Sequence, residues 1–518
     1  MRAGVIVRSA GDDVDDLLRT LWTVGSQDTP NWQLLVVAPQ RAAGQIAARI
    51  AAYGWPSPYR AQVVPVPDGT DEAHAVAAGF AELAAPWVLV LAAGDELVPH
   101  ALRTLLDATA GGGTGGGVDL VYGDSLDPAD LGPFRKPDYS PHYALGAPYL
   151  GRPVLHRTEA VEAVGGWDPA MANAAEWDLA LRVAGAGGRV VHVPELLVRA
   201  APHTPQRWDG ATRDAAIAAV RAQLLRQGFA AQVRALDEPW RLEVRPQLRG
   251  EPAVSLVMPT AGQRGEVAGR DVELAVHAVS TLAERTTYPH WDLVCVLGDT
   301  EPDGLRERIT AAAAGHPVRF VTAGGPFNFA RSVNAGVLAS DGEYVLLLND
   351  DTEVVSGDWL ARMLEWAQVP DVGAVGAKLL FADGRIQHAG VYIGAEGLPN
   401  HIHIFEPADG NTGYYGSLQL AIDRLAVTGA CLLARRATYL AVGGLCEDYP
   451  LNFNDVDFCL KLHCRGLHSV LVPDARLLHF ESSTRTPMLA DRETALYRRQ
   501  WQRFDVDPYV VIDRSAPD

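Results

Sequence analysis

The chain has 518 residues, of which 48% are hydrophobic and 21% are charged, and its formal net charge is −19 at pH 7. The chain is longer than one ordinary hydrophobic core can organise, so we expect about two to four domains. The composition is that of a soluble globular protein. The acidic excess argues against a nucleic-acid partner and against general adsorption to anionic lipid.

The first half begins with a strand-like run at the N-terminus and alternates apolar strands with helical segments. No membrane span or signal peptide is expected from its apolar runs, which are short, so we expect a cytoplasmic protein. Strands alternating with helices predict an α/β fold with a mostly parallel sheet flanked by helices. Its main landmarks are "WVLVLAAGDEL" (87–97), "AVGGW" (163–167), "EWDLALRV" (176–183) and "VHVPE" (191–195).

A join between two domains is expected after this half. Residues 212–227 have a helical pattern that Gly228 ends, and a short strand and a Pro/Gly-bounded linker follow. The predicted organisation is a first domain at 1–205, a helical and strand linker at 206–251, and a second domain at 252–518.

The second half repeats the landmarks of the first in the same order. The matching segments are "YVLLLNDDTEV" (344–354), "AVGGL" (441–445), "DVDFCLKL" (455–462) and "VLVPD" (470–474). Two diverged copies of one domain explain this order. The five cysteines lie in this half without zinc-site spacing, so neither a disulfide nor a zinc site is expected.

The copies differ at the end of the strand that precedes the turn. The second copy has Asn349, Asp350 and Asp351 there, and the first has only Ala92, Ala93 and Gly94, although Asp95 and Glu96 follow. Carboxylates at a strand end suit a hard divalent cation, Mg²⁺ or Mn²⁺, that grips a diphosphate. The alternative is an exposed Asx turn.

Two further features support a site in the second copy. Asp455 and Asp457 begin a helix, where acids also serve as plain caps, and His479 ends a strand, where an imidazole can ligate a metal. The loop "GPFNFARSVN" (325–334) lies just before the Asp350 strand.

These residues together resemble a family 2 glycosyltransferase of the GT-A fold, in the tandem-domain bacterial branch of O-antigen or rhamnan type. The resemblance covers nearly all of residues 252–511. The motifs that carry it are "VMPT", "GPFNFARSVN", "LLLNDDTEV", "VGAVGAKLLFADGRIQHAGV", "NHIHIF", "ACLLARR", "FNDVDFCLKL" and "LHFESSTR".

The resemblance implies a role for each matching residue. Asp351, His479 and Asn349 would hold the metal, and Asp455 would be the general base. Asp350 would face the ribose, and His401 and Asp457 are acceptor-site candidates. Loop histidines on the surface are the alternative interpretation for His388, His401 and His403. The remaining donor-binding candidates are Pro259, Thr260, Asn328 and Asn334. The family's base-binding Asp is replaced by Leu297, and Asp299 is the nearest substitute.

The first copy resembles the other domain of the same tandem enzymes without its metal-binding acids. Glu176 stands at the position of the base, but "VRAA" (198–201) replaces the strand end that carries the histidine. We therefore expect a degenerate domain that holds the acceptor or stiffens the active half.

The function implied is an inverting, metal-dependent glycosyltransferase of cell-surface polysaccharide biosynthesis. Its donor would be a UDP-, dTDP- or GDP-sugar and its acceptor a glycan or lipid-linked glycan, reached at the inner face of the plasma membrane by peripheral contact. One alternative is a glycan-binding or scaffolding pseudo-glycosyltransferase. The other is a sugar-1-phosphate nucleotidyltransferase, which would need a basic, Gly-rich loop after the first strand.

Overall fold

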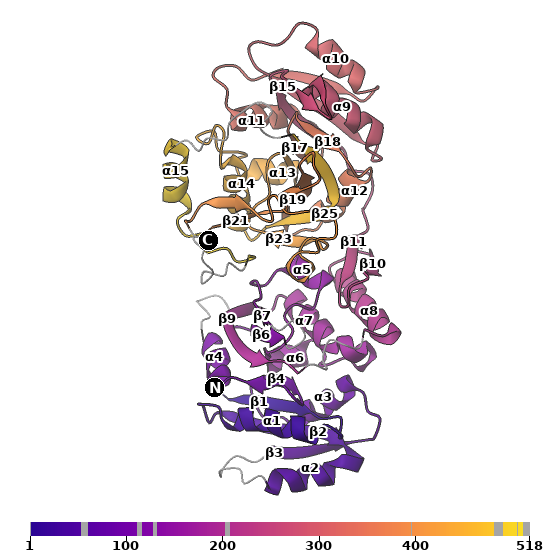
Figure 1. Cartoon of the computed structure of the whole chain (residues 1–518), viewed down its shortest axis with the longest axis vertical. Coiled ribbons are helices and arrows are strands. Elements are labelled where there is room, and N and C mark those ends of the chain that lie inside the picture. The colour runs from indigo at the N-terminus through magenta and orange to yellow at the C-terminus, as the bar shows by residue number, and fades with distance from the viewer. Residues whose placement is uncertain are drawn as a thin grey trace. The chain divides into compact units, whose positions relative to one another are not determined.

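The computed structural model describes residues 2–52, 61–110, 117–127, 132–201, 208–394, 396–480, 491–504 and 506–510. The last residues of the final family motif, 481–485, lie outside these ranges. The chain divides into two compact units, Met1–Val244 and Arg245–Asp518, whose elements are labelled in Figure 1.

The first unit is built from one large sheet and the helices around it. Its strands are β1 (Ala3–Arg8), β2 (Trp32–Pro39), β3 (Ala61–Val66), β4 (Trp87–Ala92), β5 (Glu96–Leu97), β6 (Leu120–Asp127), β7 (Gly132–Phe134), β8 (Val154–Arg157) and β9 (Val190–Arg199). Its helices are α1 (Val14–Gly25), α2 (Gln40–Ala52), α3 (Glu72–Ala81), α4 (Ala101–Ala108), α5 (Pro141–Gly146), α6 (Thr158–Ala163), η1 (Pro169–Ala174), α7 (Ala175–Gly185) and α8 (Gly210–Arg226).

The second unit has the same kind of sheet and more small strands. Its strands are β12 (Val254–Thr260), β13 (Arg264–Val267), β14 (Arg270–Glu273), β15 (Trp291–Leu297), β16 (Val318–Thr322), β17 (Tyr344–Leu348), β18 (Thr352–Val354), β19 (Val372–Leu380), β20 (Ile386–His388), β21 (Val391–Ile393), β22 (Pro399–His401), β23 (Ile422–Arg424), β24 (Cys431–Arg435) and β25 (His468–His479). Its helices are α9 (Leu274–Arg285), α10 (Leu305–Ala312), α11 (Phe329–Ala339), α12 (Trp359–Ala367), η2 (Tyr414–Gly416), α13 (Arg436–Ala441), α14 (Asn454–His463) and α15 (Asp491–Trp501).

The two large sheets have the same strand order. The first runs β3-β2-β1-β4-β8-β6-β9-β5 and the second runs β16-β15-β12-β17-β24-β19-β25-β18, so that each strand of one has a counterpart in the other. In both sheets the four strands at one end are parallel, and β8 and its counterpart β24 pair antiparallel with their neighbours. The prediction of two tandem α/β domains with mostly parallel sheets is confirmed.

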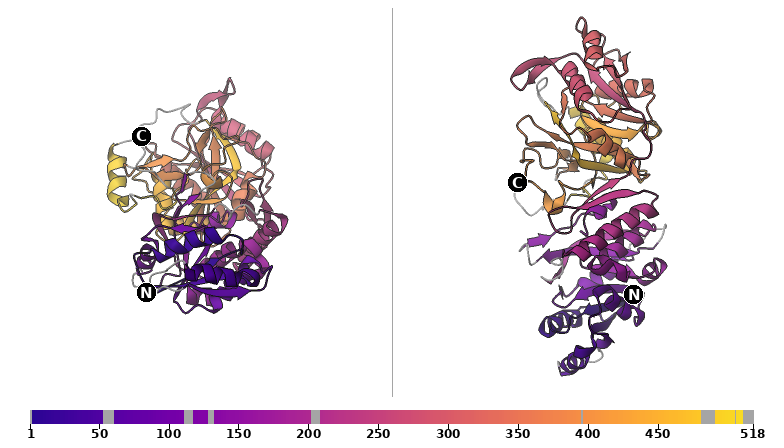
Figure 2. Two further views of the ribbon diagram at one scale, coloured as in Figure 1. Left: turned by 60° about the horizontal axis from the view of Figure 1, so that its bottom comes forward. Right: turned by 90° about the vertical axis from the view of Figure 1, so that its right-hand side faces the viewer.

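Helices cover both faces of the second sheet, as Figures 1 and 2 show, with α11 and α14 on one face and α9 and α12 on the other. Side chains alternate along a strand, so inward residues of β12, β15 and β17 such as Val257, Val294 and Leu347 share one core with Val333 of α11 and Phe458 of α14. This packing holds the ends of the parallel strands in place.

Two local features differ from the simplest interpretation of the sequence. Helix α9 begins at Leu274, because residues 264–273 before it form the antiparallel hairpin β13–β14. In the region predicted as a linker, α8 packs against α7 and η1 within the first unit, and β10 (Ala231–Ala235) pairs with β11 (Leu242–Pro246). Among the helices of the described residues, none has the length and apolar character required to cross a membrane.

Candidate active site at the carboxyl end of the second sheet

The carboxyl ends of β12 and β17 bring several predicted residues to one edge of the sheet. The two strands are parallel neighbours, and Pro259 and Thr260 are the last residues of β12. The Thr260 hydroxyl donates a hydrogen bond of 2.6 Å to Oδ2 of Asp350, which follows β17. His479 reaches the same edge because it pairs directly with Thr352 across β18 and β25.

Asp351 and His479 form a pair that suits a divalent cation. Oδ1 of Asp351 lies 3.1 Å from Nε2 of His479. This oxygen is buried and receives no hydrogen bond of normal geometry from any described residue. Neighbouring ligands of an octahedral Mg²⁺ are about 3 Å apart, since the bonds are about 2.1 Å long and meet at right angles. The distance and the unsatisfied oxygen therefore fit two ligands of one metal ion.

The orientation of Asn349 differs from that of a ligand. Its amide Nδ2 lies 3.1 Å from His479 Nε2. An amide nitrogen donates hydrogen bonds and does not coordinate metal. In this arrangement Asn349 orients the imidazole, and its role as a metal ligand stays a prediction.

The two adjacent carboxylates have different protonation behaviour. Burial raises the pKa of Asp350 to about 6, and the charge of Asp351 adds to this rise against the hydrogen bond from Thr260. Burial also acts to raise the pKa of Asp351, but the nearby His479 imidazole leaves this pKa below its ordinary value. Asp351 is thus the carboxylate that remains ionised, as a metal ligand must be.

Asp455, the predicted base, is held at the start of α14. Its Oδ2 accepts a hydrogen bond of 2.8 Å from Gly429 N–H, and its Oδ1 accepts one of 2.8 Å from Val456 N–H. The next residue after Gly429 is Ala430, whose carbonyl accepts from Asn349 N–H at 3.0 Å. The base is therefore linked through a short backbone segment to the strand end that carries the metal-site residues. Its carboxylate remains partly exposed.

Asp457 has a different environment from Asp455. It is fully buried, forms an ion pair of 2.8 Å with Lys461, and accepts hydrogen bonds from Gln500 and Trp501 of α15. These contacts hold α15 against α14. The structure directs this side chain to Lys461 and α15 and does not bring it to the sheet edge.

Asn328 and Asn334 are engaged within the protein. Asn328 caps α11 by accepting from Arg331 N–H at 2.9 Å, and it donates to the Glu447 carbonyl. The amide oxygen of Asn334 accepts from the Tyr439 hydroxyl and Leu445 N–H, and its nitrogen donates to the Leu445 carbonyl. These bonds attach α11 to the loop after α13, and the donor-binding role of both asparagines stays a prediction.

His388 and His401 contact each other in the second unit. His388 is fully buried, so the surface-loop interpretation is wrong for it. Its Nε2 accepts from Thr428 N–H at 3.3 Å, which leaves Nδ1 to donate to His401 Nδ1 at 2.8 Å. Burial lowers the pKa of His388 well below the usual value, so it is neutral. His401 is partly exposed, and His403 pairs with Glu406.

Asp299 contributes to the loop before α11. Its Oδ2 accepts a hydrogen bond of 2.9 Å from Gly325 N–H. This contact connects the end of β15 to the segment that carries the "GPFN" residues. Leu297, which stands in place of the family's base-binding acid, is buried in β15.

The corresponding edge of the first unit carries a positively charged side chain, that of Arg152. Ala92 and Gly94 offer no ligand, and the buried Asp95 accepts from the N–H groups of Ala92 and Ala201 at 2.8 and 2.7 Å. Nη1 of Arg152 lies 2.7 Å from Asp95 Oδ2. A guanidinium therefore sits beside the strand end from which the acids are missing, and it compensates the remaining carboxylate.

Glu176, at the position of the base, is partly buried in the first unit, and 35% of its side chain is exposed. It accepts a hydrogen bond of 2.8 Å from the Trp167 indole, and burial raises its pKa to about 7. Sequence reasoning missed Arg152, because this residue lies far along the chain from Asp95 and has no motif around it.

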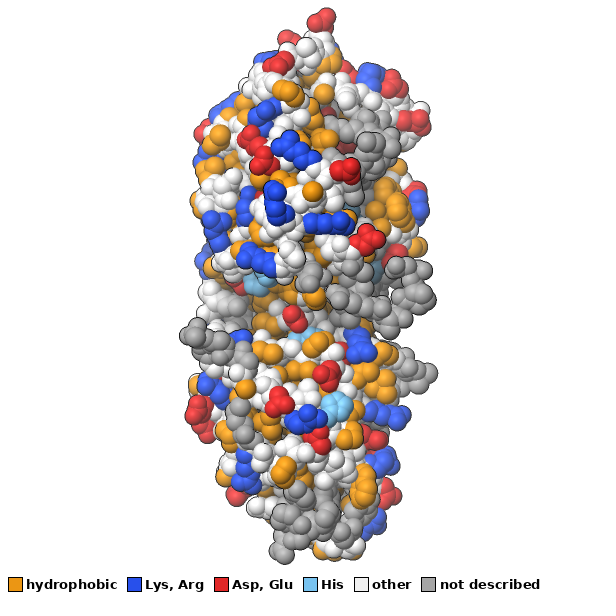
Figure 3. Space-filling model, turned by 90° about the vertical axis from the view of Figure 1, so that its left-hand side faces the viewer, with side chains coloured by type: hydrophobic (Ala, Val, Ile, Leu, Met, Phe, Trp, Pro, Cys, Tyr) orange, Lys and Arg blue, Asp and Glu red, His pale blue; other side chains and the backbone are white. Residues whose placement is uncertain are grey.

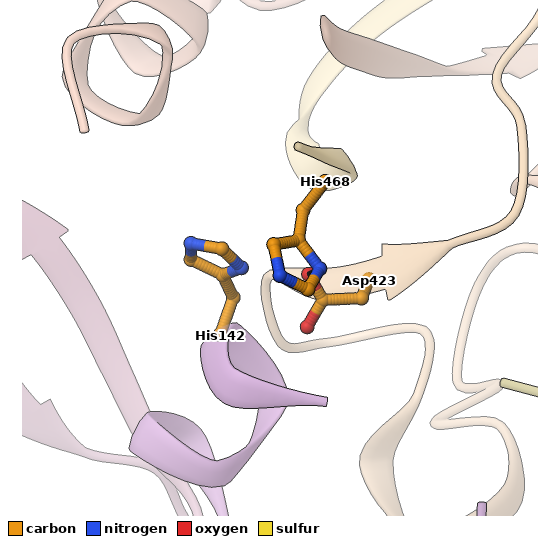
Figure 4. A group of neighbouring side chains, drawn as sticks. All are labelled: His142, Asp423 and His468. Atoms are coloured by element: carbon orange, nitrogen blue, oxygen red, sulfur yellow. Dashed lines mark ion pairs between the residues drawn. The ribbon is translucent and has the colours of Figure 1, made fainter. Parts of the chain in front are cut away.

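A second acid–imidazole pair lies elsewhere in the second unit. Asp423 of β23 is fully buried, and its Oδ1 lies 3.2 Å from Nδ1 of His468 at the start of β25 (Figure 4). His468 and His479 occupy opposite ends of β25, so this pair is remote from the strand ends described above.

Comparisons with known proteins find a matching family and similar sequences. Residues 270–419 match the family described as "Glycosyl transferase family 2". The chain is 32% identical over 488 residues to "O-antigen biosynthesis protein RfbC" of Myxococcus xanthus, which covers 90% of this chain and 36% of that protein. It is 29% identical over 195 residues to "N-acetylglucosaminyl-diphospho-decaprenol L-rhamnosyltransferase" of Mycobacterium tuberculosis, covering 33% and 62%. The chain thus spans about a third of the first of these relatives.

Among solved structures, one similar chain is "Mannosyltransferase PcManGT from Pyrobaculum calidifontis in complex with GDP-Man and Mn2+". The sequence identity is 17% and the TM-score 0.33, and the match covers 48% of this chain and 61% of that one.

Proposed function

We propose that the protein is a metal-dependent, inverting glycosyltransferase of bacterial surface-polysaccharide biosynthesis, a proposal supported by the match of residues 270–419 to glycosyl transferase family 2. It transfers a sugar from a nucleotide-diphosphate donor to a hydroxyl of a glycan or lipid-linked glycan. The observation that supports this most is the Asp351–His479 pair, with its unsatisfied buried oxygen, at the carboxyl edge of the sheet.

The donor lies along the ends of β12 and β17 in this proposal. Parallel α/β sheets bind ligands at this edge. Asp350, oriented by Thr260, accepts from the ribose hydroxyls, and Asp351 and His479 hold Mg²⁺ or Mn²⁺. The bound ion supplies positive charge that stabilises the diphosphate as it leaves.

Asp455 is the general base in this proposal. Its carboxylate takes the proton of the acceptor hydroxyl while the acceptor oxygen forms a bond to the anomeric carbon. The bond between that carbon and the diphosphate oxygen breaks, and the nucleoside diphosphate leaves. A single base that activates the acceptor for attack opposite the leaving group inverts the anomeric configuration. The two backbone hydrogen bonds to Asp455 hold the base in place for this step.

The first unit, in this proposal, is a degenerate domain without metal-dependent activity. Arg152 supplies the positive charge beside Asp95, and both oxygens of Asp95 are already engaged. Trp167 holds Glu176 through a hydrogen bond. The unit serves to bind the acceptor glycan or to support the active half.

The nucleotidyltransferase alternative is disfavoured by the segment after β12. That activity needs a basic loop whose backbone cradles a triphosphate. Here residues 264–273 form a hairpin, in which Arg264 is paired with Asp271 at 2.9 Å. The segment after β12 is therefore folded on itself as a hairpin and does not form an open basic loop.

Contact with a lipid-linked acceptor is supported by arginines on and just after α15. In a chain of net charge −19, Arg492, Arg498, Arg499 and Arg503 are exposed within a short segment. Figure 3 shows the side of the second unit on which α15 lies, where several Lys and Arg side chains are close together. We propose that these residues meet anionic headgroups at the cytoplasmic face of the membrane.

The test is a panel of UDP-, dTDP- and GDP-sugars incubated with the protein and Mn²⁺, Mg²⁺ or EDTA. The proposal predicts release of one nucleoside diphosphate with Mn²⁺ or Mg²⁺ and none with EDTA, together with a β-linked product from an α-linked donor or the reverse. Turnover that is unchanged in EDTA would contradict metal dependence, and retention at the anomeric carbon would contradict the single-base mechanism.

A further inference from the structure

Gln387 contacts the histidine of the candidate metal site on the side away from Asp351. It is the middle residue of β20, which pairs with β19, and its side chain is only 2% exposed. Its Oε1 lies 2.6 Å from Nδ1 of His479, and the Nε2 atom of its amide lies 3.5 Å from the His479 carbonyl. Gln387 therefore meets both the ring and the backbone of one residue.

The hydrogen bond between these residues determines which ring nitrogen carries the proton. An amide oxygen only accepts hydrogen bonds, so Nδ1 of His479 must donate to it. In a neutral imidazole the other nitrogen, Nε2, then has the free electron pair. Asn349 agrees with this assignment, because its amide nitrogen donates toward Nε2. The ring thus presents its electron pair on the side of Asp351 Oδ1.

We propose that Gln387 is a positioning residue that holds His479 in its metal-binding tautomer and thereby sets the affinity of the site for a divalent cation. The proposal rests on the metal role of Asp351 and His479 given above. Partners of this kind, behind a histidine ligand, fix the ring orientation and raise its basicity, and their loss typically weakens metal binding about 10- to 100-fold.

The position of His388, the residue after Gln387, shows why β20 can direct Gln387 at His479. Successive side chains of a strand point in opposite directions. Gln387 is directed at His479, while His388 contacts Thr428 and His401. One short strand therefore orients two imidazoles, and only one of them belongs to the candidate metal site.

The first measurement is Mn²⁺ binding by electron paramagnetic resonance in the absence of substrate. Gln387→Met removes the acceptor at similar volume and is expected to raise the dissociation constant for Mn²⁺ about 10- to 100-fold. Gln387→Glu keeps an acceptor and is expected to bind Mn²⁺ as well as wild type or more tightly. Gln368→Met is the matched control, because Gln368 bonds to the Gln247 carbonyl away from the site, and it should leave binding unchanged.

The second measurement is the tautomer of His479 in the metal-free protein, read from its ring nitrogens by ¹⁵N nuclear magnetic resonance. Nδ1 should carry a proton in wild type and in Gln387→Glu, and it should lose that proton in Gln387→Met, in which Nε2 alone is protonated and faces Asp351. A purely structural role would lower the melting temperature without this loss of the Nδ1 proton. If Gln387→Met does not fold, a Gln387→Glu protein without a proton on Nδ1, or with 10-fold weaker Mn²⁺ binding, would overturn the proposal.

The outcomes separate this inference from the proposed function. Mn²⁺ binding that is lost in Asp351→Ala but unchanged in Gln387→Met would overturn the role of Gln387 and leave the metal site standing. Binding that survives in both Asp351→Ala and His479→Ala would overturn the metal site itself.

Discussion

Oδ1 of Asp351 and Nε2 of His479 lie 3.1 Å apart, and the buried carboxylate oxygen receives no hydrogen bond of normal geometry from any residue that the structure describes. Two electron-pair donors held this close repel unless a cation or a proton lies between them. β18 and β25 hold them there, since Thr352 pairs directly with His479. The proposed chemistry follows from this relationship.

Asp351→Ala should abolish Mn²⁺-dependent turnover. Loss of a ligand from a site with two protein ligands removes the charge stabilisation of the leaving diphosphate. We expect activity to fall by about 100- to 1,000-fold, the range seen when one electrostatic contact to a transition state is removed. Donor turnover at saturating Mn²⁺ measures it. Asp341→Ala is the control, because Asp341 is exposed and pairs with Arg319 on the surface. Equal loss in both variants would refute a specific role for Asp351.

Asp455→Asn should lower kcat by about 100- to 10,000-fold while the Mn²⁺ affinity and the donor KM stay near wild type, because only the proton acceptor is lost. Steady-state kinetics with varied donor, together with Mn²⁺ binding, separate these quantities. Asp448→Asn, at an exposed position nearby, is the matched control. A variant with normal kcat would exclude Asp455 as the base.

Asp457→Asn should reduce stability instead. The change leaves the Lys461 ammonium without its buried partner while Gln500 and Trp501 still find an oxygen. Breaking a buried ion pair from one side costs about 3 kcal/mol, near the lower end because Lys461 is partly exposed. Denaturant unfolding measures it. If stability were unchanged and kcat fell, Asp457 would belong to the active site after all.

The sequence predicts that Asp350, Asp351 and His479 lie at one edge of the sheet, because the carboxyl ends of parallel strands meet at one edge. The hydrogen bonds that Asn328 and Asn334 make within the protein were not predictable. Asparagine at a helix start serves as a cap as readily as it binds a ligand, and sequence alone does not distinguish the two. The contact of Gln387 with His479 was not predictable from sequence either, since only the strand pairing shows which of two adjacent side chains faces His479.

Arg152→Gln should destabilise the first unit without changing Mn²⁺ binding. Asp95 is fully buried, and it would keep its backbone donors but lose its ion pair with Arg152. The expected cost is about 3 kcal/mol in the free energy of unfolding. Arg103→Gln, which breaks an exposed pair with Asp28, should leave unfolding unchanged. Mn²⁺ binding that changes with Arg152 would contradict a metal-free first unit.

Replacing Arg498, Arg499 and Arg503 together by Gln should weaken binding to vesicles that contain anionic lipid. Each arginine near such a surface contributes about 1 kcal/mol, so the triple change should lower the partition coefficient on the order of 100-fold at low salt. Sedimentation with phosphatidylglycerol vesicles measures it, and neutral vesicles are the control. Binding that is equally weak to both kinds of vesicle in wild type would argue against the membrane contact.

The location of the chemistry is tested most directly by counting Mn²⁺ ions per chain and measuring donor turnover in the same samples of wild type, Asp351→Ala and His479→Ala. The account predicts one tightly bound ion in wild type, none in either variant, and loss of turnover with the ion. Turnover that persists in Asp351→Ala, or an ion that remains bound in both variants, would place the active metal site elsewhere and contradict the assignment to the second unit.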